Sequence, residues 1–524
     1  MSLAFAVVGL ANSGSYVTRD VSARVCERET AASQTEMSTE KWRTGLQIQQ
    51  LHTPTDNVDR SAMKKISSMF SALQEKFQRA KAGAPTPAAV APPAGRESHC
   101  GLRFFEYLLV VSLRKRSSGV GYEPQVTYQF PKREVMGRLQ REQEEKSMKA
   151  AHLFCFPEGV HWAPVTEYSS ETFSFVLTEV DGSRRNGYCR RLLPAGKGAR
   201  LPEAYCIISH VACFGLFSKI FDEVEKRRQI STAMIYPFMQ SLREAPLPSP
   251  GSTVSISSFI PDAGTQIIRL TRPADSWLEH VDFTALFSRL NDEELLLVFT
   301  AAVLERRIIF ISEELSTLSQ VLHAVAALLY PFVWQHTFIS IVPSVLIDVC
   351  EAPTPYLLGV QKSMMGLITD HSDVMIVDLS TGAPTKFITR IGDEESLLPL
   401  KLKEELLSGL SARTHHASTE QLNRLVSEAF LSVFVKTVGH FSEHIKRGGK
   451  PRQFQKKSFL KAVENKTYSS FVKLFIQTQM FDLFIQEEET QSNPNGFFHR
   501  KVKEHRDRMK QEKAKAGWVR GVVI

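Results

Sequence analysis

The sequence lacks several features that would assign it to a secreted, membrane-spanning or metal-binding class. None of its seven cysteines forms a CxxC pair, and their odd number and wide spacing favour free thiols in a reducing compartment. The most apolar stretch, residues 324–334, is interrupted by Pro331 and falls well short of the ~20 residues that cross a bilayer. The N-terminal apolar run has no preceding basic residues, unlike a secretory signal. We therefore expect a cytoplasmic protein.

Motifs of catalysis and cofactor binding are also missing. The stretch Lys446–Pro451 has glycines and lysines without the spacing of a phosphate loop, and no GxSxG elbow occurs. His415 and His416 are adjacent, so on a helix they would point about 100° apart and not at one metal. His323 and His336 lie among apolar residues, as hydrogen-bonded core histidines do. The sequence predicts no catalytic residue, no metal and no cofactor.

The net charge of +8 is concentrated in a few segments. From Arg500 to Arg520, nine basic residues stand against three acidic ones, which predicts a solvated helix or tail. Weak attraction to an anionic membrane, worth about 1 kcal/mol per basic residue near the surface, is an alternative. Nucleic acid fits poorly, because no interleaved aromatic residues accompany the charge.

A second basic segment interrupts an otherwise polar N-terminal arm. Residues 62–81 predict an amphipathic helix, because apolar residues recur there at helical spacing with lysine and arginine mostly off the stripe. This helix could pack on the main domain, lie on a membrane or bind a partner groove. The rest of 1–99 is predicted to be disordered, ending in an Ala/Pro linker.

The centre of the chain predicts a mostly parallel α/β module. Asn291 with Glu294 three residues later predicts the start of a helix that is apolar nearly all round. A strand over 308–311, a helix over 318–330 and a strand over 338–342 follow. Alternation of helix and strand at this spacing is typical of parallel sheets.

The flanking regions predict different architectures. Residues 104–245 suit a small antiparallel sheet with helices, and the Pro/Ser-rich run at 247–252 reads as a linker. From Leu398 onward strand character disappears and helices are predicted over 400–410, 418–446, 457–463 and 469–486. We expect five parts: an arm (1–99), an upstream module (100–246), a central module (253–397), a helical subdomain (398–490) and a basic tail (491–524).

A long, ordered series of sequence motifs resembles the motifs of the DENN-domain family. LERRIIFIS, ALLYPFVWQHTFI and APTPYLLGV are similar to its central segment, YQFPKRE and CFP to its upstream segment, and FVKLFIQTQMFDLFIQ to its downstream segment. Ser340 stands where the pattern leads us to expect proline. The resemblance covers about 104–489 and implies a longin-like α/β module, a mostly parallel α/β module and an all-helical C-terminal subdomain.

The resemblance also implies a function. Members of this family act as guanine-nucleotide exchange factors for Rab-type small GTPases, and the shorter members of subclass 2, which this chain resembles, imply a route between late endosomes and the trans-Golgi. Such a protein needs no catalytic residues of its own, because exchange rests on differential binding. A non-catalytic module of the same fold, binding a GTPase or an adaptor, is the alternative.

Candidate contact residues lie on the loop from Asp348 to Tyr356, which we expect at the exit of the central sheet, where open α/β sheets place their sites. Asp348, Glu351 and Tyr356 are the candidates for GTPase binding, although Tyr356 and the neighbouring prolines could simply fix a turn. The run Glu305, Arg306 and Arg307 is expected to form a structural charged knot, an internal ion-pair network between a buried helix and a strand.

Overall fold

The computed structural model describes residues 103–521, with gaps at 118, 133–149, 160, 179–183, 262–263, 273–280, 384, 414–417, 447–452 and 491–495. The helix predicted over 62–81, His415 and His416, and most of the stretch from Lys446 to Pro451 lie outside the described residues. None of the described helices combines the length and apolarity needed to cross a bilayer.

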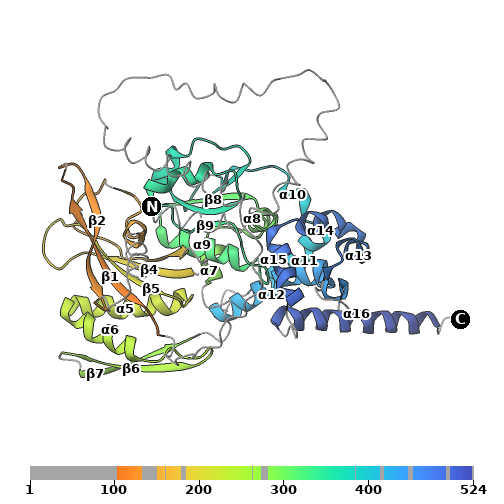
Figure 1. Ribbon diagram of the computed structural model, residues 1–524, viewed down its shortest axis with the longest axis horizontal. Coiled ribbons are helices and arrows are strands. Elements are labelled where there is room, and N and C mark those ends of the chain that lie inside the picture. Colours follow the sequence, from red (N-terminus) through yellow and green to blue (C-terminus); the bar gives the residue numbers. More distant parts are fainter. Residues whose placement is uncertain are drawn as a thin grey trace, which may run out of the picture. The chain divides into compact units, whose positions relative to one another are not determined.

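The first module is a five-stranded antiparallel sheet covered by two helices (Figure 1). The sheet order is β2-β1-β5-β4-β3, so β2 and β3 are its edges. Successive residues of β1 alternate between two cores: Leu108 and Val110 face the helices, whereas Leu109 and Val111 face the core shared with the central module. The elements are β1 (Tyr107–Lys115), β2 (Tyr122–Phe130), β3 (Thr172–Thr178), β4 (Arg184–Leu192), β5 (Glu203–Ser209), α5 (Phe214–Ile230), η1 (Thr232–Met234) and α6 (Ile235–Glu244).

A buried arginine holds the interior of this module together. Arg191 is 2% exposed and donates two hydrogen bonds to the Glu158 carboxylate, at 2.7 and 2.8 Å, and one to the carbonyl of Cys155. Burial opposes its charge, but attraction to Glu158 and Tyr168 outweighs this and raises the pKa of Arg191. The ion pair is therefore a structural feature and leaves no free charge for chemistry.

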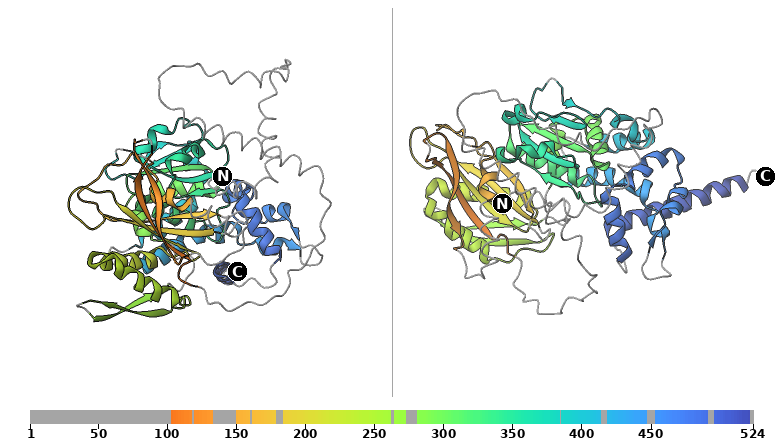
Figure 2. Two further views of the ribbon diagram at one scale, coloured as in Figure 1. Left: turned by 60° about the vertical axis from the view of Figure 1, so that its left-hand side comes forward. Right: turned by 45° about the horizontal axis from the view of Figure 1, so that its top comes forward.

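A two-stranded ribbon follows where the sequence predicted only a linker and the start of the central module. β6 (Thr253–Ile260) and β7 (Gly264–Thr271) pair antiparallel, and β6 packs on α6 (Figure 2). Buried and exposed residues alternate along the second half of β6: Ile256, Ser258 and Ile260 are buried, whereas Ser257 and Phe259 are exposed. Such alternation is typical of a half-buried strand, although the inward serine and the outward phenylalanine obscure it in the sequence.

The central module is the mostly parallel α/β unit that the sequence predicts. Its sheet has the order β12-β11-β8-β10-β9, and only β12 runs antiparallel to its neighbour. α8 begins with the predicted capping box: the Asn291 side chain accepts from the Glu294 N–H, and the Glu294 side chain accepts from the Asn291 N–H. The elements are α7 (Phe283–Phe287), α8 (Asp292–Val303), β8 (Arg307–Ser312), α9 (Leu315–Ala327), β9 (Thr337–Ile339), η2 (Ser344–Glu351), β10 (Tyr356–Gln361), η3 (Lys362–Leu367), β11 (Val374–Asp378) and β12 (Phe387–Thr389).

Helices dominate the rest of the chain, as expected. Ser418 and Gln421 form the predicted capping box of the longest buried helix. The elements are α10 (Glu394–Leu397), α11 (Leu400–Ser411), α12 (Thr419–Val438), η4 (Phe441–His444), β13 (Ile445–Lys446), β14 (Gln453–Phe454), α13 (Lys456–Lys461), η5 (Lys466–Tyr468), α14 (Ser469–Phe475), α15 (Gln479–Thr490) and α16 (Phe497–Gly521).

Two of the helices predicted in the helical subdomain are wrong in extent by several residues. The helix expected over 418–446 ends at Val438, because Gly439 caps it and the chain then turns through η4. The helix expected over 469–486 is broken between Phe475 and Gln479, where the Thr478 hydroxyl accepts from the Phe481 N–H and begins α15. In both cases a local chain terminator outweighs apolar periodicity.

Candidate binding groove

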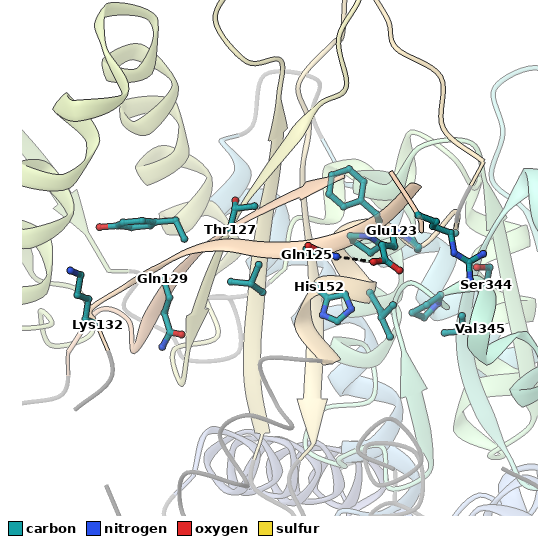
Figure 3. A pocket seen from close by; sticks show the side chains of 17 residues that line it. Glu123, Gln125, Thr127, Gln129, Lys132, His152, Ser344 and Val345 are labelled. Atoms are coloured by element: carbon teal, nitrogen blue, oxygen red, sulfur yellow. Dashed lines mark hydrogen bonds between the residues drawn. The ribbon is translucent and has the colours of Figure 1, made fainter. Parts of the chain in front are cut away.

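A groove of about 920 Å³ lies between the free edge of the first sheet and the central module. Seven consecutive residues of β2, from Glu123 to Gln129, form one wall. His152, Leu153 and the loop from Phe156 to Gly159 form the floor, and Pro343 to Val345, at the start of η2, form the far side. Figure 3 shows the labelled side chains of β2, His152, Ser344 and Val345 around the opening.

The far side of the groove is fixed to its floor by backbone contacts. The Ser344 N–H donates to the Pro157 carbonyl at 2.8 Å. Gly159 has φ +88°, and a Cβ there would lie 2.6 Å from the Ser344 hydroxyl oxygen. Only glycine fits this position on both counts, so the sequence permits the close approach that closes the groove at this end.

The lining suits docking of another molecule's surface. Val126 and Val345 are 37% and 58% exposed, two apolar side chains on opposite walls. Around them stand a few charged and polar groups, including Glu123, which accepts from the Gln125 amide at 2.7 Å. The Gln129 amide nitrogen is buried without a hydrogen-bond partner among the described residues. Apolar anchors with a polar rim are typical of protein interfaces.

Neither a metal-ligand cluster nor an exposed cysteine is found among the residues that the structure describes. Within the described ranges, no three histidine, cysteine or acidic side chains are placed to hold a metal ion. The five cysteines of the described chain are free and buried. Burial raises the pKa of the thiols of Cys155, Cys189 and Cys206, which disfavours the reactive thiolate.

The predicted contact residues extend from this groove along η2. Asp348 and Glu351 are exposed on η2, about 8 and about 14 Å beyond Ser344 if the rise is ~2 Å per residue. Tyr356 is fully buried, and its hydroxyl donates to the Cys350 carbonyl at 2.7 Å. Its side chain therefore does not reach the surface and instead fixes the end of η2.

The position expected for this loop is wrong in one respect. We expected the segment from Asp348 to Tyr356 to leave the sheet, but Tyr356 is the first residue of β10 and pairs with Arg307, the first residue of β8. The segment therefore enters at the amino edge of the parallel strands. The sequence interpretation lacked the strand direction, which depends on the distant pairing with β8.

The charged run between α8 and β8 does not form a single knot. Glu305 accepts from the N–H groups of Gln479 and Met480 at the start of α15. Arg306 pairs with Asp393, and Arg307 donates to the Ser372 carbonyl at 2.6 Å. Each of the three side chains has its own partner in a different element. The tight turn places Glu305 at φ +53°, in the left-handed region.

The groove residues themselves were missed by the sequence interpretation. Val126 and Val345 are more than two hundred positions apart, and neither belongs to a recognisable motif. The only local indication is Pro124, since proline within a strand is typical of a sheet edge. This marks β2 as an edge without showing what lies opposite.

Comparison with known proteins identifies the class. Three family models match consecutive parts of the chain: the uDENN domain over residues 124–192, the DENN (AEX-3) domain over 200–382 and the dDENN domain over 454–501. The chain therefore belongs to the DENN-domain family and contains its three parts.

Its relatives place it in the subclass 2 group of that family. It is 54% identical to "DENN domain-containing protein 2D" of Mus musculus over 420 residues, covering 79% of this chain and 89% of the relative. Identity to the Homo sapiens protein of the same name is 52% over 462 residues, covering 86% and 98%. "DENN domain-containing protein 2B" of Homo sapiens is 48% identical over 415 residues, which are 76% of this chain and 36% of that protein.

Proposed function

We propose that this protein is a guanine-nucleotide exchange factor for a Rab-type small GTPase, promoting GDP release and GTP loading. The observation that carries the proposal is the presence of all three DENN parts in one chain, since the family generally has this activity. A small GTPase holds its nucleotide through phosphates, Mg²⁺ and ordered switch loops. A protein that binds the switches in a conformation incompatible with these contacts lowers the affinity of the GTPase for nucleotide. By linkage, bound nucleotide lowers the affinity of the GTPase for that protein by the same factor.

The groove is the surface that supports this proposal best. Differential binding requires a rigid scaffold with a few apolar anchors and charges. The groove has Val126 and Glu123 on the β2 wall and Val345 on the far side, which the Ser344–Pro157 hydrogen bond fixes to the floor. Asp348 and Glu351 are exposed on the continuation of the far wall and are proposed to contact the GTPase. Tyr356 would act only by positioning η2.

Exchange by this protein is proposed to take place on membranes of the late endosome and trans-Golgi route. The chain would be cytoplasmic and would associate peripherally with vesicle or endosomal membranes. The basic segments at 62–81 and 491–524 would add weak attraction to anionic lipid, about 1 kcal/mol per basic residue near the surface.

The test is release of a fluorescent GDP analogue from a panel of purified Rab GTPases, with excess GTP and the full chain. Concentration-dependent acceleration on one or a few Rabs is expected. Val345→Asp should lower the exchange efficiency by about 30-fold or more, because a charged group would replace an apolar anchor worth ~2 kcal/mol. Val333→Asp is the matched control, since Val333 is 57% exposed, close to the 58% of Val345, and does not line the groove.

The alternative is a non-catalytic module that binds a GTPase or an adaptor. Stable binding of a Rab without acceleration, lost in the Val345→Asp variant, would favour this alternative. Equal exchange by the Val345→Asp and Val333→Asp variants would remove the groove from the mechanism, whatever the activity of the parent chain.

A further inference from the structure

The helical subdomain has a strongly basic stretch that the exchange proposal does not use. From Lys446 to Lys473 the sequence contains nine basic residues and one acidic residue, Glu464. Six of the nine lie in the described part of the chain: Lys446, Lys456, Lys457, Lys461, Lys466 and Lys473. Nine basic residues minus one acidic residue give an excess of +8 within 28 residues, which equals the net charge of the whole protein. This stretch is therefore the main positive region of the chain.

Hydrogen bonds hold two of these lysines, Lys456 and Lys466, at the ends of two short helices. The ammonium group of Lys466 donates to the carbonyls of Lys461 and Val463, at 3.2 and 3.1 Å, at the C-terminal end of α13. That of Lys456, at the start of α13, donates to the Ile476 carbonyl at 3.0 Å, at the C-terminal end of α14. Cations at helix C-termini are favourable, and here they fix α13, η5 and α14 against one another.

Three further lysines on these helices are exposed and unneutralised. Lys457 and Lys461 are four residues apart on α13, so they share one face of the helix. Lys473 is exposed near the end of α14. The lysine ion pairs seen among the described residues are those of Lys362, Lys436 and Lys501, and none of them involves these three side chains.

The nearby acidic groups do not cancel this charge. Asp482 is partly buried, and burial raises its pKa against the attraction of Lys456. Glu464 is exposed, but it is a single carboxylate among the lysines. We define the lysine face as Lys456, Lys457, Lys461, Lys466 and Lys473. Gathering like charges opposes folding, so a surface of this kind gains most from an anionic counterpart.

An exposed leucine lies next to one residue of the lysine face. Leu474 follows Lys473 directly and is 41% exposed, although its neighbours Phe471, Val472 and Phe475 are buried. An exposed apolar side chain next to a lysine matches the two layers of a bilayer surface, with anionic headgroups outside and acyl chains beneath. An acidic protein surface would also match the lysines and could take the leucine as an apolar anchor, so failure to bind anionic vesicles would favour that occupant.

We propose that the lysine face is a docking surface for an anionic lipid bilayer, with Leu474 entering the headgroup region. This surface is argued from the helical subdomain alone. Its use, to hold the protein on the membrane that bears its GTPase, rests on the proposed function.

Sedimentation of the full chain with vesicles tests the proposal. We expect binding to vesicles of phosphatidylcholine with phosphatidylserine, and little to phosphatidylcholine alone, with affinity falling as salt rises. The triple variant Lys457→Gln, Lys461→Gln and Lys473→Gln should bind about 100-fold more weakly, from about fivefold per lysine. It keeps Lys456 and Lys466, whose hydrogen bonds are structural. Leu474→Ser should weaken binding without changing its salt dependence.

The matched control is the triple variant Lys197→Gln, Lys219→Gln and Lys226→Gln. These lysines are also exposed and lie in the first module. Replacing them removes the same net charge as the first triple variant. Vesicle affinity within about twofold of the parent chain is expected for this control. The same is expected for the combined Lys457→Arg, Lys461→Arg and Lys473→Arg variant, which keeps the charge. Equal loss in both glutamine variants would overturn the proposal in favour of a general charge effect.

Two other outcomes would also overturn it. Unchanged binding by the 457/461/473 glutamine variant would assign membrane contact to other basic segments, and equal binding to neutral vesicles would exclude charge as its basis. Exchange measured in solution, without vesicles, separates this proposal from the exchange proposal. The glutamine variant should retain full activity there, and a parent chain without exchange activity would leave the vesicle result intact.

Discussion

Glu305 couples the central sheet to the helical subdomain through one carboxylate. It accepts from the N–H groups of Gln479 and Met480, the first two residues of α15, at 2.8 and 2.7 Å. First-turn N–H groups have no partner within their own helix. The imidazole Nε2 of His336 lies 3.0 Å from the same carboxylate. The side chain is 9% exposed, so water is a poor substitute for it.

We expect Glu305→Ala to lower the free energy of unfolding by about 2–3 kcal/mol. Loss of a capping acceptor costs about 1 kcal/mol, and loss of a negative charge at a helix N-terminus costs up to about 1 kcal/mol. Leaving the N–H groups of Gln479 and Met480 buried without an acceptor adds roughly 1 kcal/mol. Glu305→Gly should be less destabilising than Glu305→Ala by about 1 kcal/mol, because the backbone at φ +53° favours glycine.

Denaturant unfolding and hydrogen exchange of the α15 amides measure the two parts of this prediction. Exchange should accelerate first at Met480 and its neighbours in α15. The exposed Glu404, on α11, supplies the control variant Glu404→Ala, with a change below about 0.5 kcal/mol. If Glu305→Ala changed neither the unfolding free energy nor α15 exchange, the carboxylate would not act as a cap, and an Ala variant more stable than the Gly variant would refute the backbone argument.

Three further predictions concern other buried or partly buried groups. Glu158→Ala should cost about 3–5 kcal/mol in denaturant unfolding, because it leaves the buried Arg191 charge unpaired, and Glu158→Gln should cost less; equal, small losses would show that water replaces the carboxylate. Gly359→Ala should cost about 3 kcal/mol or more, since a Cβ would lie 2.1 Å from the Ser340 carbonyl oxygen, and a variant with parent-like thermal unfolding would contradict this contact. Burial lowers the pKa of His440. The contribution of the neutral side chain to the free energy of unfolding is therefore fully present above the ordinary histidine pKa of about 6.5 and is lost as the pH falls below that value. His440→Gln should therefore lose less stability than the parent chain between about pH 7.5 and about pH 5 in thermal unfolding, and parallel losses would assign the sensitivity to other groups.

The sequence was sufficient to predict the helices and strands whose ends are determined by residues close by in the chain. The capping boxes at Asn291 and Ser418 each involve residues three positions apart, so both helix starts were predicted at the correct residue. The strand expected over 308–311 is found as β8, because a short β-branched run bounded by charge has few alternatives. The parallel character of the central sheet followed from the spacing of such elements.

Boundaries set by distant contacts were not predictable in this way. The end of α12 is only partly of this kind, because at Gly439 a Cβ would lie 2.4 Å from the Val435 carbonyl oxygen of the same helix and 3.1 Å from a Val502 methyl group of α16. The start of α9 is three residues earlier than expected, and there Glu171 of the first module accepts from the Leu315 and Ser316 N–H groups. Neither Val502 nor Glu171 is visible from the local sequence.

The candidate groove could not be predicted from the sequence for the same reason. Its walls come from β2, from residues 152–159 and from the start of η2, and no local pattern connects them. A binding surface for differential recognition also has no fixed residue chemistry, unlike a metal centre. Asp348 and Glu351 were chosen because a loop with charges near a sheet is often functional, and their role stays a prediction.

The contacts between the three DENN parts bear on how exchange could work. Glu171 of the first module caps α9 of the central module, and Glu305 of the central module caps α15 of the helical subdomain. Phe332, after α9, packs against Phe434 and Phe475 with ring centroids 4.9 and 4.8 Å apart. Helix caps require defined geometry, so these contacts oppose sliding of one part against another. A groove held in this way would present its anchors without prior rearrangement, so binding energy could go into displacing the switch loops instead of ordering the exchange factor.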